Sequence, residues 1–387
     1  MKILVATTSF PRYPGDNRSP FLLSLAENLV KQGHSVQVAA LHVPGVKAEE
    51  TYSNVKIKRL RYAPERWEVL QETRAGIPGS LQKNKFAIVL LALYILRLSV
   101  YILRHAHRFD MIHANWTAAA LAAVWTKPLH RKKVVTTLHG SDLRLGSRKG
   151  LLSRLTHYVL QHSDKVISVS RYLDNQVAKM GIEDARRVVI SNGIDPVNIS
   201  GEQAQSKQII YIGSFTENKR VADLLDAFAQ LKKRHPDFSL MLVGEGPEER
   251  ALRAVADKLG LDTAQIFAGV LPHDLALEQI ARSFCLVLPS VHEGFGIVLL
   301  EAMARGVPCV GAESGSIREL LADGRGVLFE PCNPSALAAS IETLITDKEL
   351  CSSIREAGLR KAANYSWHEI AYQVAAVYRE VTGPHAG

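Results

Sequence analysis

Residues 284–312 read FCLVLPSVHEGFGIVLLEAMARGVPCVGA, and this stretch decides the fold class. It opens with a short apolar run, passes through a glycine-containing loop, takes on helical periodicity from about Phe295, and closes with a second apolar run. Continuous apolar strands that alternate with helices are typical of parallel sheets covered by helices on both faces. The stretch therefore predicts two buried parallel strands joined by a helix.

The same alternation extends over the whole chain of 387 residues. A helix is expected after Ser19, with Pro20 at its first position and Gly33 at its end. Strands are predicted in KILVAT, SVQVAAL, VKIKRL, MIHAN, KVVTTLHG, KVISVS and RVVIS, and then in QIIYIGS, SLMLVGEG, QIFAGV, FCLVLPS, PCVGA and GVLFE. So many strands suit two doubly wound domains better than one sheet, and the polar segment 195–207 is the expected join. The cleft between two such domains is the default ligand site.

Charge is divided unevenly between the halves of the chain. Residues 1–195 carry 29 Lys and Arg against 14 Asp and Glu, whereas residues 196–387 carry 18 against 24. A basic first half indicates a surface for anionic partners such as lipid headgroups, phosphorylated substrates or nucleic acid, with a merely solvated surface as the alternative. The four cysteines form no C-x-x-C and are expected as buried free thiols. MKILVATTSF is expected to be a strand and not a secretory signal.

Residues 86–103, FAIVLLALYILRLSVYIL, form an apolar run interrupted by Arg97 and Ser99. Three interpretations stay open: a buried helix of the first domain, a helix that also enters a membrane interface, and a membrane span. A span is the least favoured, because an internal arginine costs roughly 2.5–3.5 kcal/mol on insertion and the α/β pattern resumes directly afterwards. Basic residues flank the run at Lys83, Lys85, Arg104 and Arg108.

Glycines follow three strands of the second half. They are Gly213, Gly244 with Gly246, and Gly294 with Gly296. Glycine lets a ligand approach the backbone closely, and Lys219 with Arg220 adds cations suited to a diphosphate. The alternative is that these glycines only make tight turns. The G-E-G-P spacing disfavours a nicotinamide dinucleotide, and the chain has no P-loop motif.

Glu293 and Glu301 have seven residues between them. Such acids could be a catalytic pair, two metal ligands, or two groups that bind hydroxyls. With Glu293 before the helix and Glu301 on it, the carboxylates are roughly 10 Å apart. This separation excludes one shared proton or metal and favours two hydroxyl clusters of an extended ligand, such as a sugar and a ribose.

HEGFGIVLLEAMARGVPCV resembles the E-x7-E signature of family 4 glycosyltransferases, which have the GT-B fold. FDMIHAN, HGSD, ISNGID, IGSFTENKR, VGEGP and YSWHEIAYQVAAVY resemble further family motifs, in order, over nearly the whole chain. The resemblance implies two Rossmann-like α/β domains facing a central cleft. Residues 1–200 would bind the acceptor, residues 201–365 would bind the nucleotide sugar, and residues 366–387 would form a helix returning to the first domain.

The resemblance also implies roles for individual residues. Glu293 would bind the donor sugar's hydroxyls, Glu301 the ribose, Lys219 the diphosphate, and the 269–271 region with Val270 the base. His139 and Asp142 would lie near the transferred sugar, with Glu293, His139 and Lys219 as the catalytic set. The remaining predicted contacts are Gly213, Arg220, Gly244, Gly294, the backbone amides of Phe295, Gly296 and Ile297, and Asn17 and Arg18 in the 15–18 loop.

Two positions depart from the family pattern. Ser214 stands where the family often has arginine, and Arg220 stands where it has glycine, so Arg220 is expected to replace part of the missing charge. His113 is interpreted as a hydrogen-bonded strand residue and Trp116 as a core residue. Asn192 and Gly193 are interpreted as a turn.

The sequence thus predicts a retaining glycosyltransferase that moves a sugar from a nucleotide-diphosphate sugar to a glycan or lipid-linked acceptor in cell-surface glycan assembly. No obligatory metal, no other cofactor and no nucleic-acid partner are expected. We expect a cytoplasmic protein, peripheral at the inner face of the cytoplasmic membrane. The alternatives are a transferase with a small soluble acceptor and a non-catalytic nucleotide-sugar-binding protein.

Overall fold

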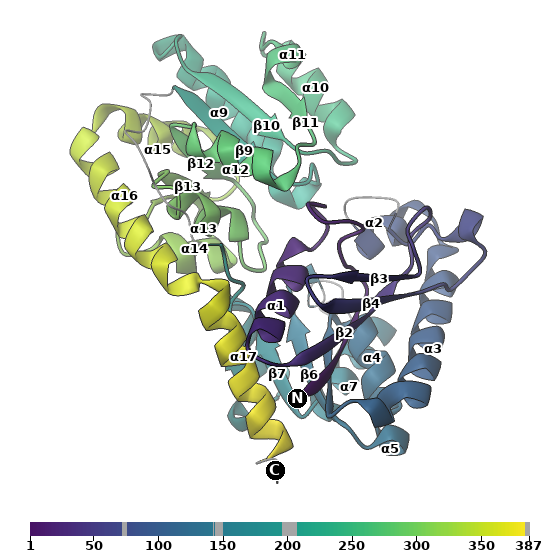
Figure 1. The fold of residues 1–387 in the computed structure, drawn as a ribbon. Coiled ribbons are helices and arrows are strands. Elements are labelled where there is room, and N and C mark those ends of the chain that lie inside the picture. The colour runs from purple at the N-terminus through teal and green to yellow at the C-terminus, as the bar shows by residue number, and fades with distance from the viewer. Residues whose placement is uncertain (72–75, 142, 144–149, 196–206, 384–387) are drawn as a thin grey trace. The chain divides into compact units, whose positions relative to one another are not determined.

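The computed structural model describes residues 1–71, 76–141, 143, 150–195 and 207–383. By their internal packing the residues form two compact units, Met1–Gly193 with Trp367–Gly387, and Ile194–Ser366. The predicted boundary between residues 200 and 201 lies outside the described residues. The predicted pair of Rossmann-like α/β folds is confirmed, since each unit is a sheet with helices whose strands are parallel, apart from one edge strand of the first unit (Figure 1).

The first unit contains an eight-stranded sheet of order β3-β4-β2-β1-β5-β6-β7-β8. Its strands are β1 (Lys2–Thr7), β2 (Ser35–Leu41), β3 (Glu49–Tyr52), β4 (Val55–Leu60), β5 (Met111–Asn115), β6 (Lys133–Leu138), β7 (Lys165–Ser168) and β8 (Arg187–Val189). Its helices include α1 (Pro20–Lys31), α2 (Gly76–Lys83), α3 (Ala87–His105), α4 (Thr117–Trp125), α5 (Lys127–His130), α7 (Leu151–His162), α8 (Arg171–Lys179) and α17 (Trp367–Thr382).

The second unit contains a six-stranded parallel sheet of order β11-β10-β9-β12-β13-β14. Its strands are β9 (Gln208–Ile212), β10 (Ser239–Val243), β11 (Phe267–Gly269), β12 (Cys285–Leu288), β13 (Cys309–Ala312) and β14 (Val327–Phe329). Its helices are α9 (Val221–Arg234), α10 (Glu249–Lys258), α11 (Thr263–Ile266), α12 (His273–Ala281), α13 (Ile297–Met303), α14 (Gly315–Leu321), α15 (Pro334–Thr346) and α16 (Lys348–Ala362).

Strand β3 is the one described strand that the sequence analysis missed. It is short and polar, EETY, and pairs antiparallel with β4 at the edge of the first sheet. Ser53 and Asn54 between the two strands both have positive φ, 46° and 65°. This conformation belongs to a tight hairpin turn, so the turn residues carried a signal that the apolar pattern of the strand did not.

Strand β1 shows how one buried strand serves two cores. Leu4 and Ala6 face a cluster that includes residues of α3 and α4, whereas Ile3 and Val5 face a cluster that includes residues of α1 and α17. Successive side chains of a strand point to opposite faces, so a strand covered by helices on both sides must be apolar throughout. This requirement is why the apolar runs located the strands.

Other local expectations need correction. Helix α1 begins at Pro20 as predicted, but Ser19 has left-handed backbone angles, and its hydroxyl donates to the Ser9 hydroxyl instead of capping the helix. Helix α13 begins at Ile297 and not at Phe295.

Cysteines 285, 309 and 351 are buried free thiols as expected, whereas Cys332 is exposed because it lies in the turn after β14, with φ of 60°.

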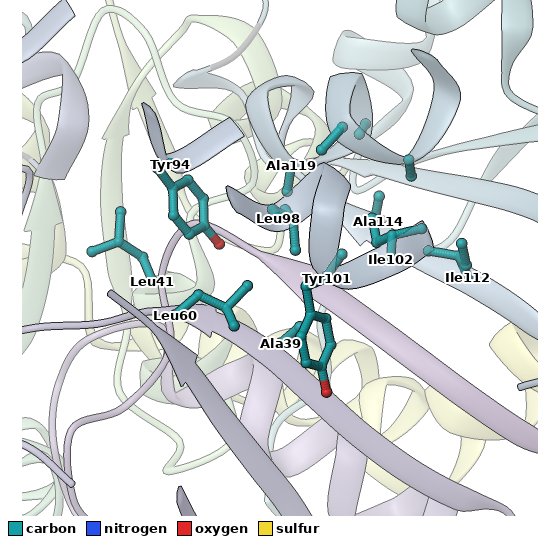
Figure 2. Close-up of a cluster of buried hydrophobic side chains, with 14 of the residues drawn as sticks. Ala39, Leu41, Leu60, Tyr94, Leu98, Tyr101, Ile102, Ile112, Ala114 and Ala119 are labelled. Carbon is teal, nitrogen blue, oxygen red and sulfur yellow. The ribbon is translucent and has the colours of Figure 1, made fainter. Parts of the chain in front are cut away.

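Helix α3 carries the long apolar run, and only one of its faces is buried. Tyr94, Leu98, Tyr101 and Ile102 join the cluster drawn in Figure 2, and the Tyr94 hydroxyl donates to the Thr7 carbonyl at 2.5 Å. The expectation of a buried helix is therefore met on this face alone.

Two leucines of α3 make a matched test of its orientation. Leu98 is fully buried and Leu96 is 58% exposed. We expect Leu98→Ala to lower the free energy of unfolding by about 2–5 kcal/mol, and Leu96→Ala to change it by less than about 0.5 kcal/mol. Urea denaturation measures both values, and equal losses would contradict the orientation.

Candidate functional site

The second unit places its predicted site residues where four neighbouring strands end. The chain runs from β9 outward through β10 and β11, then crosses back to β12 beside β9 and continues outward to β14. Ligands of doubly wound sheets bind at such a reversal, outside the carboxyl ends of the strands. Around it lie Gly213, Lys219 and Arg220 after β9, Gly244 after β10, Val270 after β11, and Glu293, Gly294, Phe295, Gly296, Ile297 and Glu301 after β12.

Glu293 and Lys219 meet across this reversal. The Lys219 ammonium lies 2.5 Å from the Glu293 carboxylate, and each side chain is 18% exposed. Lys219 ends a short 3-10 turn in the loop after β9, and Glu293 lies in the loop after β12. The family resemblance implies contacts with different parts of a donor for these two side chains, and the structure joins them in one largely buried ion pair.

Hydrogen bonds hold the two loops in place. The backbone N–H of Val291 donates to the Asn218 carbonyl at 3.0 Å. The Ser316 hydroxyl donates to the Glu293 carbonyl at 2.9 Å. Glu293 is therefore fixed through its backbone as well as its side chain, which limits the conformational entropy lost when a ligand binds.

The glycines after β9 and β10 pack the loops against each other. A Cβ on Gly244 would lie 1.9 Å from the Gly213 carbonyl oxygen, and one on Gly246 would lie 2.2 Å from that of Phe215. The N–H groups of Gly213 and Gly244 donate to the carbonyls of Val243 and Gly269. Neighbouring strand ends therefore already use these two N–H groups, and the predicted contact of Gly213 and Gly244 with a ligand stays a prediction.

The backbone N–H groups in the loop after β12 differ from those of Gly213 and Gly244, which donate within the sheet. Within the described part of the chain, the N–H groups of Phe295, Gly296 and Ile297 donate to no protein acceptor. They lead into α13, and Gly296 has φ of 80°. Successive N–H groups before a helix form a favourable environment for anionic oxygens.

Glu301 lies one helix turn into α13, with its side chain 13% exposed. Burial raises its pKa to about 7, against the opposing charge of Arg305 and with a further contribution from Asp195. The His273 Nε2 lies 3.6 Å from the carboxylate, and burial lowers the pKa of this histidine. The carboxyl is thus poised between its two protonation states near neutral pH in the absence of a ligand.

Arg220 does not present a free charge at this edge. Its guanidinium binds both carboxylate oxygens of Asp223, at 2.8 and 2.9 Å. Its backbone is left-handed, with φ of 53°, at the start of α9. The carbonyl of Ser214, where an arginine was expected from the family pattern, accepts from the Tyr211 hydroxyl at 2.9 Å. Compensation for the missing arginine by Arg220 therefore requires exchange with Asp223.

His139 follows β6 in the first unit and packs against two aromatic rings. Its Nε2 lies 3.0 Å from the Asn115 side-chain oxygen, which only accepts, so Nε2 carries the proton. Its ring centre lies 4.6 Å from that of Trp116 and 4.9 Å from that of Phe21. Burial lowers its pKa to about 3, and His113 adds to this effect. His139 is thus a neutral hydrogen-bonding group at physiological pH and not a cation.

Other predicted residues of this unit are placed as follows. The Arg18 guanidinium donates to the Gln71 side chain at 3.3 Å, and Asn17 precedes it in the loop after β1. Asp142 lies outside the described residues. His113 bonds the Tyr378 hydroxyl at 2.6 Å and the Thr137 hydroxyl at 2.7 Å, so its interpretation as a satisfied strand residue is confirmed.

Trp116, interpreted as a core residue, and Gly193, interpreted as part of a turn, both lie against other residues of the first unit. Trp116 is partly buried and packs against the core cluster that contains residues of α1 and α17. A Cβ on Gly193 would lie 2.7 Å from the Trp367 side chain, so this glycine permits a close approach to α17.

Sequence reasoning missed the residues that surround the two glutamates. Ser316 fixes Glu293 from the start of α14, and His273, Arg305 and Asp195 surround Glu301. His273 stands at the start of α12, shortly after β11, so its position at a strand end was a usable signal. Ser316 carried none, because only tertiary structure brings α14 to the β12 loop.

Comparison with known proteins gives family matches over most of the chain. Residues 20–198 match the model described as Glycosyltransferase Family 4, and residues 197–361 match Glycosyl transferases group 1. The chain is 30% identical over 284 residues to a glycogen synthase of Mycobacterium tuberculosis, covering 70% of this chain and 69% of the relative. It is 27% identical over 373 residues to N-acetyl-alpha-D-glucosaminyl L-malate synthase of Bacillus anthracis, covering 92% and 91%.

Solved structures share the fold. Sucrose-phosphate synthase from Thermosynechococcus elongatus superposes with a TM-score of 0.78 at 19% identity, covering 98% of both chains. Anabaena HepE in complex with UDP-glucose superposes with a TM-score of 0.77 at 20% identity, covering 98% of this chain and 100% of that one.

The contact at Gly244 makes a stability prediction. We expect Gly244→Ala to lower the free energy of unfolding by more than about 3 kcal/mol, because its Cβ meets backbone and its φ is 148°. Gly260→Ala is the control, since its φ of 69° is strained but its Cβ meets nothing within 4 Å. That variant should lose only about 1–2 kcal/mol in the same denaturation experiment. Similar losses in both would show that the loops can separate.

Glu301 makes a prediction about stability and pH. Its pKa of about 7 in the folded chain exceeds the ordinary 4.5, so stability is lost as pH rises from 4.5 through 7. Glu301→Gln resembles the protonated carboxyl, so the variant should be more stable than the parent by up to about 3 kcal/mol at pH 8 and by less than about 1 kcal/mol at pH 5. The control is Glu278→Gln, at an exposed residue of α12, which should change the free energy of unfolding by less than about 0.5 kcal/mol at either pH. A Glu301→Gln offset that does not vary with pH would contradict the raised pKa.

Proposed function

Because the chain belongs to glycosyltransferase family 4, we propose that it transfers a sugar, with retention of configuration, from a nucleoside-diphosphate sugar to a glycan or lipid-linked acceptor. The observation that carries this proposal is the Glu293–Lys219 ion pair at the reversal between β9 and β12. It combines a cation for phosphate with an acceptor for sugar hydroxyls at the place where doubly wound sheets bind nucleotides.

When the donor binds, Lys219 and Glu293 each exchange the other for a group of the donor. Diphosphate oxygens accept from the Lys219 ammonium and from the N–H groups of Phe295, Gly296 and Ile297. Glu293, released from Lys219, then accepts hydrogen bonds from hydroxyls of the sugar. The exchange leaves neither charge unpaired, which matters because an isolated buried charge is strongly destabilising.

Glu301 binds the ribose at the other end of the donor. An ionised carboxylate can accept from both vicinal hydroxyls, whereas the protonated form gives up part of that capacity. Donor binding therefore favours the ionised form of a group whose pKa is about 7 in the ligand-free chain. His273 and Arg305 stand beside it and favour that form when they are charged.

The transfer step needs no basic side chain. The bond from the anomeric carbon to the phosphate oxygen breaks, and the acceptor oxygen attacks from the same face. Its proton passes to the departing phosphate oxygen, while Lys219 and the backbone N–H groups stabilise the charge on the leaving diphosphate. His139, neutral with its proton on Nε2, suits a hydrogen-bonding role toward the substrate and not proton transfer. We propose that no metal is obligatory.

We infer a lipid-linked acceptor from the name of one relative and from the basic charge of the first half. One relative, from Komagataeibacter xylinus, is named GDP-mannose:cellobiosyl-diphosphopolyprenol alpha-mannosyltransferase and is 27% identical over 74% of this chain. A lipid-linked acceptor places the protein in the cytoplasm, at the inner face of the membrane. The B. anthracis relative, whose name specifies malate, favours the alternative of a small soluble acceptor.

The first test is donor binding, followed by turnover. A panel of UDP-, GDP- and ADP-sugars is screened by thermal unfolding, where a donor at 100 times its Kd should stabilise the chain by about 2.7 kcal/mol. Glu301→Ala should abolish the shift, and the exposed change Glu356→Ala on α16 should keep it. The product made with a working acceptor should retain the anomeric configuration of the donor.

Three results would contradict parts of this proposal. If Glu301→Ala kept the full donor-induced stabilisation, Glu301 would not be the residue that binds the ribose. An inverted product would overturn retention. Binding without transfer or hydrolysis of any sugar would favour the non-catalytic nucleotide-sugar-binding alternative.

A further inference from the structure

The buried face of α3 fixes this helix firmly to the first unit. Leu90, Tyr94, Leu98 and Ile102 are between 0% and 1% exposed and pack in one cluster with strands of the sheet (Figure 2). The Tyr94 hydroxyl also donates to the Thr7 carbonyl at the end of β1. Removing α3 from the sheet would expose this core, so the helix stays in place while its other face is in contact with solvent.

The outward face of α3 is an apolar stripe. Val89, Leu93, Leu96, Val100 and Leu103 follow one another at spacings of four, three, four and three residues, which places them on one side of a helix. Leu96 is 58% exposed, and Ile88 beside the stripe is 59% exposed. From Val89 to Leu103 the stripe is about 21 Å long. A continuous apolar strip of this length on a surface indicates a binding partner.

Only basic charges accompany this stripe. Arg97 and Arg104 each follow a stripe leucine and therefore flank it on the same side, while Lys85 and Arg108 stand near its ends. Residues 76–109 contain no Asp or Glu. Among the ion pairs of the described residues, none involves these four basic side chains. Their charges are available to an external anion.

We propose that the outward face of α3 docks this protein on a membrane surface that carries anionic lipid. The stripe enters the boundary between headgroups and acyl chains, and Arg97, Arg104, Lys85 and Arg108 contact lipid phosphates. This inference deepens the proposed function by naming the surface that brings the first unit to a lipid-linked acceptor. It depends on the apolar stripe and its charges, and it holds for any donor sugar.

The helix lies on the membrane and does not cross it. The segment Ala87–Arg108 has 22 residues, and an 18-residue window within it has a mean hydropathy of 2.0, which is sufficient for a span by length and composition. A span, however, would carry the open sheet packed on the inner face of α3 into the hydrocarbon region, where open sheet edges do not occur. An amphipathic helix parallel to the surface satisfies both faces.

Charge also favours a membrane over a second copy of the chain. A symmetric dimer through this face would bring the same patch from both copies together, and therefore like charges against like. An anionic lipid surface instead supplies the opposite charge over the whole length of the stripe.

The test is binding to vesicles without any acceptor present. The full chain should sediment with vesicles of phosphatidylglycerol and phosphatidylcholine at low salt, less at high salt, and weakly with phosphatidylcholine alone. Arg97→Gln with Arg104→Gln should weaken binding about 30-fold, from roughly 1 kcal/mol per basic residue at the surface. Leu93→Gln with Leu96→Gln should weaken it at least about tenfold.

A matched control changes two exposed arginines elsewhere. Arg282→Gln with Arg360→Gln removes the same net charge from α12 and α16 of the second unit and should leave vesicle binding unchanged. All variants should keep the parental Tm and the donor-induced shift, which separates a failure of docking from a failure of the proposed function. No sedimentation of the parent at low salt, or unchanged binding of either α3 variant, would overturn the proposal. A dimer that Leu93→Gln with Leu96→Gln dissociates would assign the face to a second copy.

Discussion

The ion pair between Lys219 and Glu293 is the interaction on which the second unit's site depends. It joins the loops that leave β9 and β12, the two strands between which the order of the sheet reverses. Because both side chains are largely buried, neither charge can be left without a partner at small cost. A ligand that enters here must replace both partners at once, which selects molecules that carry an anionic group beside hydroxyl donors. The proposed specificity for a sugar joined to a diphosphate rests on that requirement.

Glu301 shows that the same site is maintained at the expense of stability. A buried carboxylate with a pKa of about 7 is a poor choice for a chain selected only to fold, since a neutral amide would fit the same space. The charge of Arg305 favours the ionised form of this carboxyl and the charge of Asp195 disfavours it, while the His273 Nε2 lies 3.6 Å away. The glycines of the β9 and β10 loops have the opposite role. They allow backbone to pack on backbone, and so they serve the fold that positions the ligand and not the ligand itself.

Helix α3 serves two environments with two faces. Its inner side completes the core over β1, β2 and β4, and its outer side presents leucines beside arginines. A run of apolar residues that is interrupted only by Arg97 and Ser99 could not by itself reveal this division, because burial on one face and lipid contact on the other require the same side chains. The geometry separates them: Leu98 packs inside while Leu96, two residues earlier, faces out.

The sequence alone is enough to locate most strands of the two sheets, because strands covered on both faces are mostly apolar, as in KILVAT of β1 and CLVL of β12. It also placed Glu293 in a loop and Glu301 on a helix, since glycines and helical periodicity are local features. It missed β3, whose stability comes from pairing with β4 and not from its own polar residues. The meeting of Lys219 with Glu293, and of Ser316 with the Glu293 backbone, is set by the tertiary fold. These contacts join residues through the register and order of strands, which fix distances that local pattern and composition leave open.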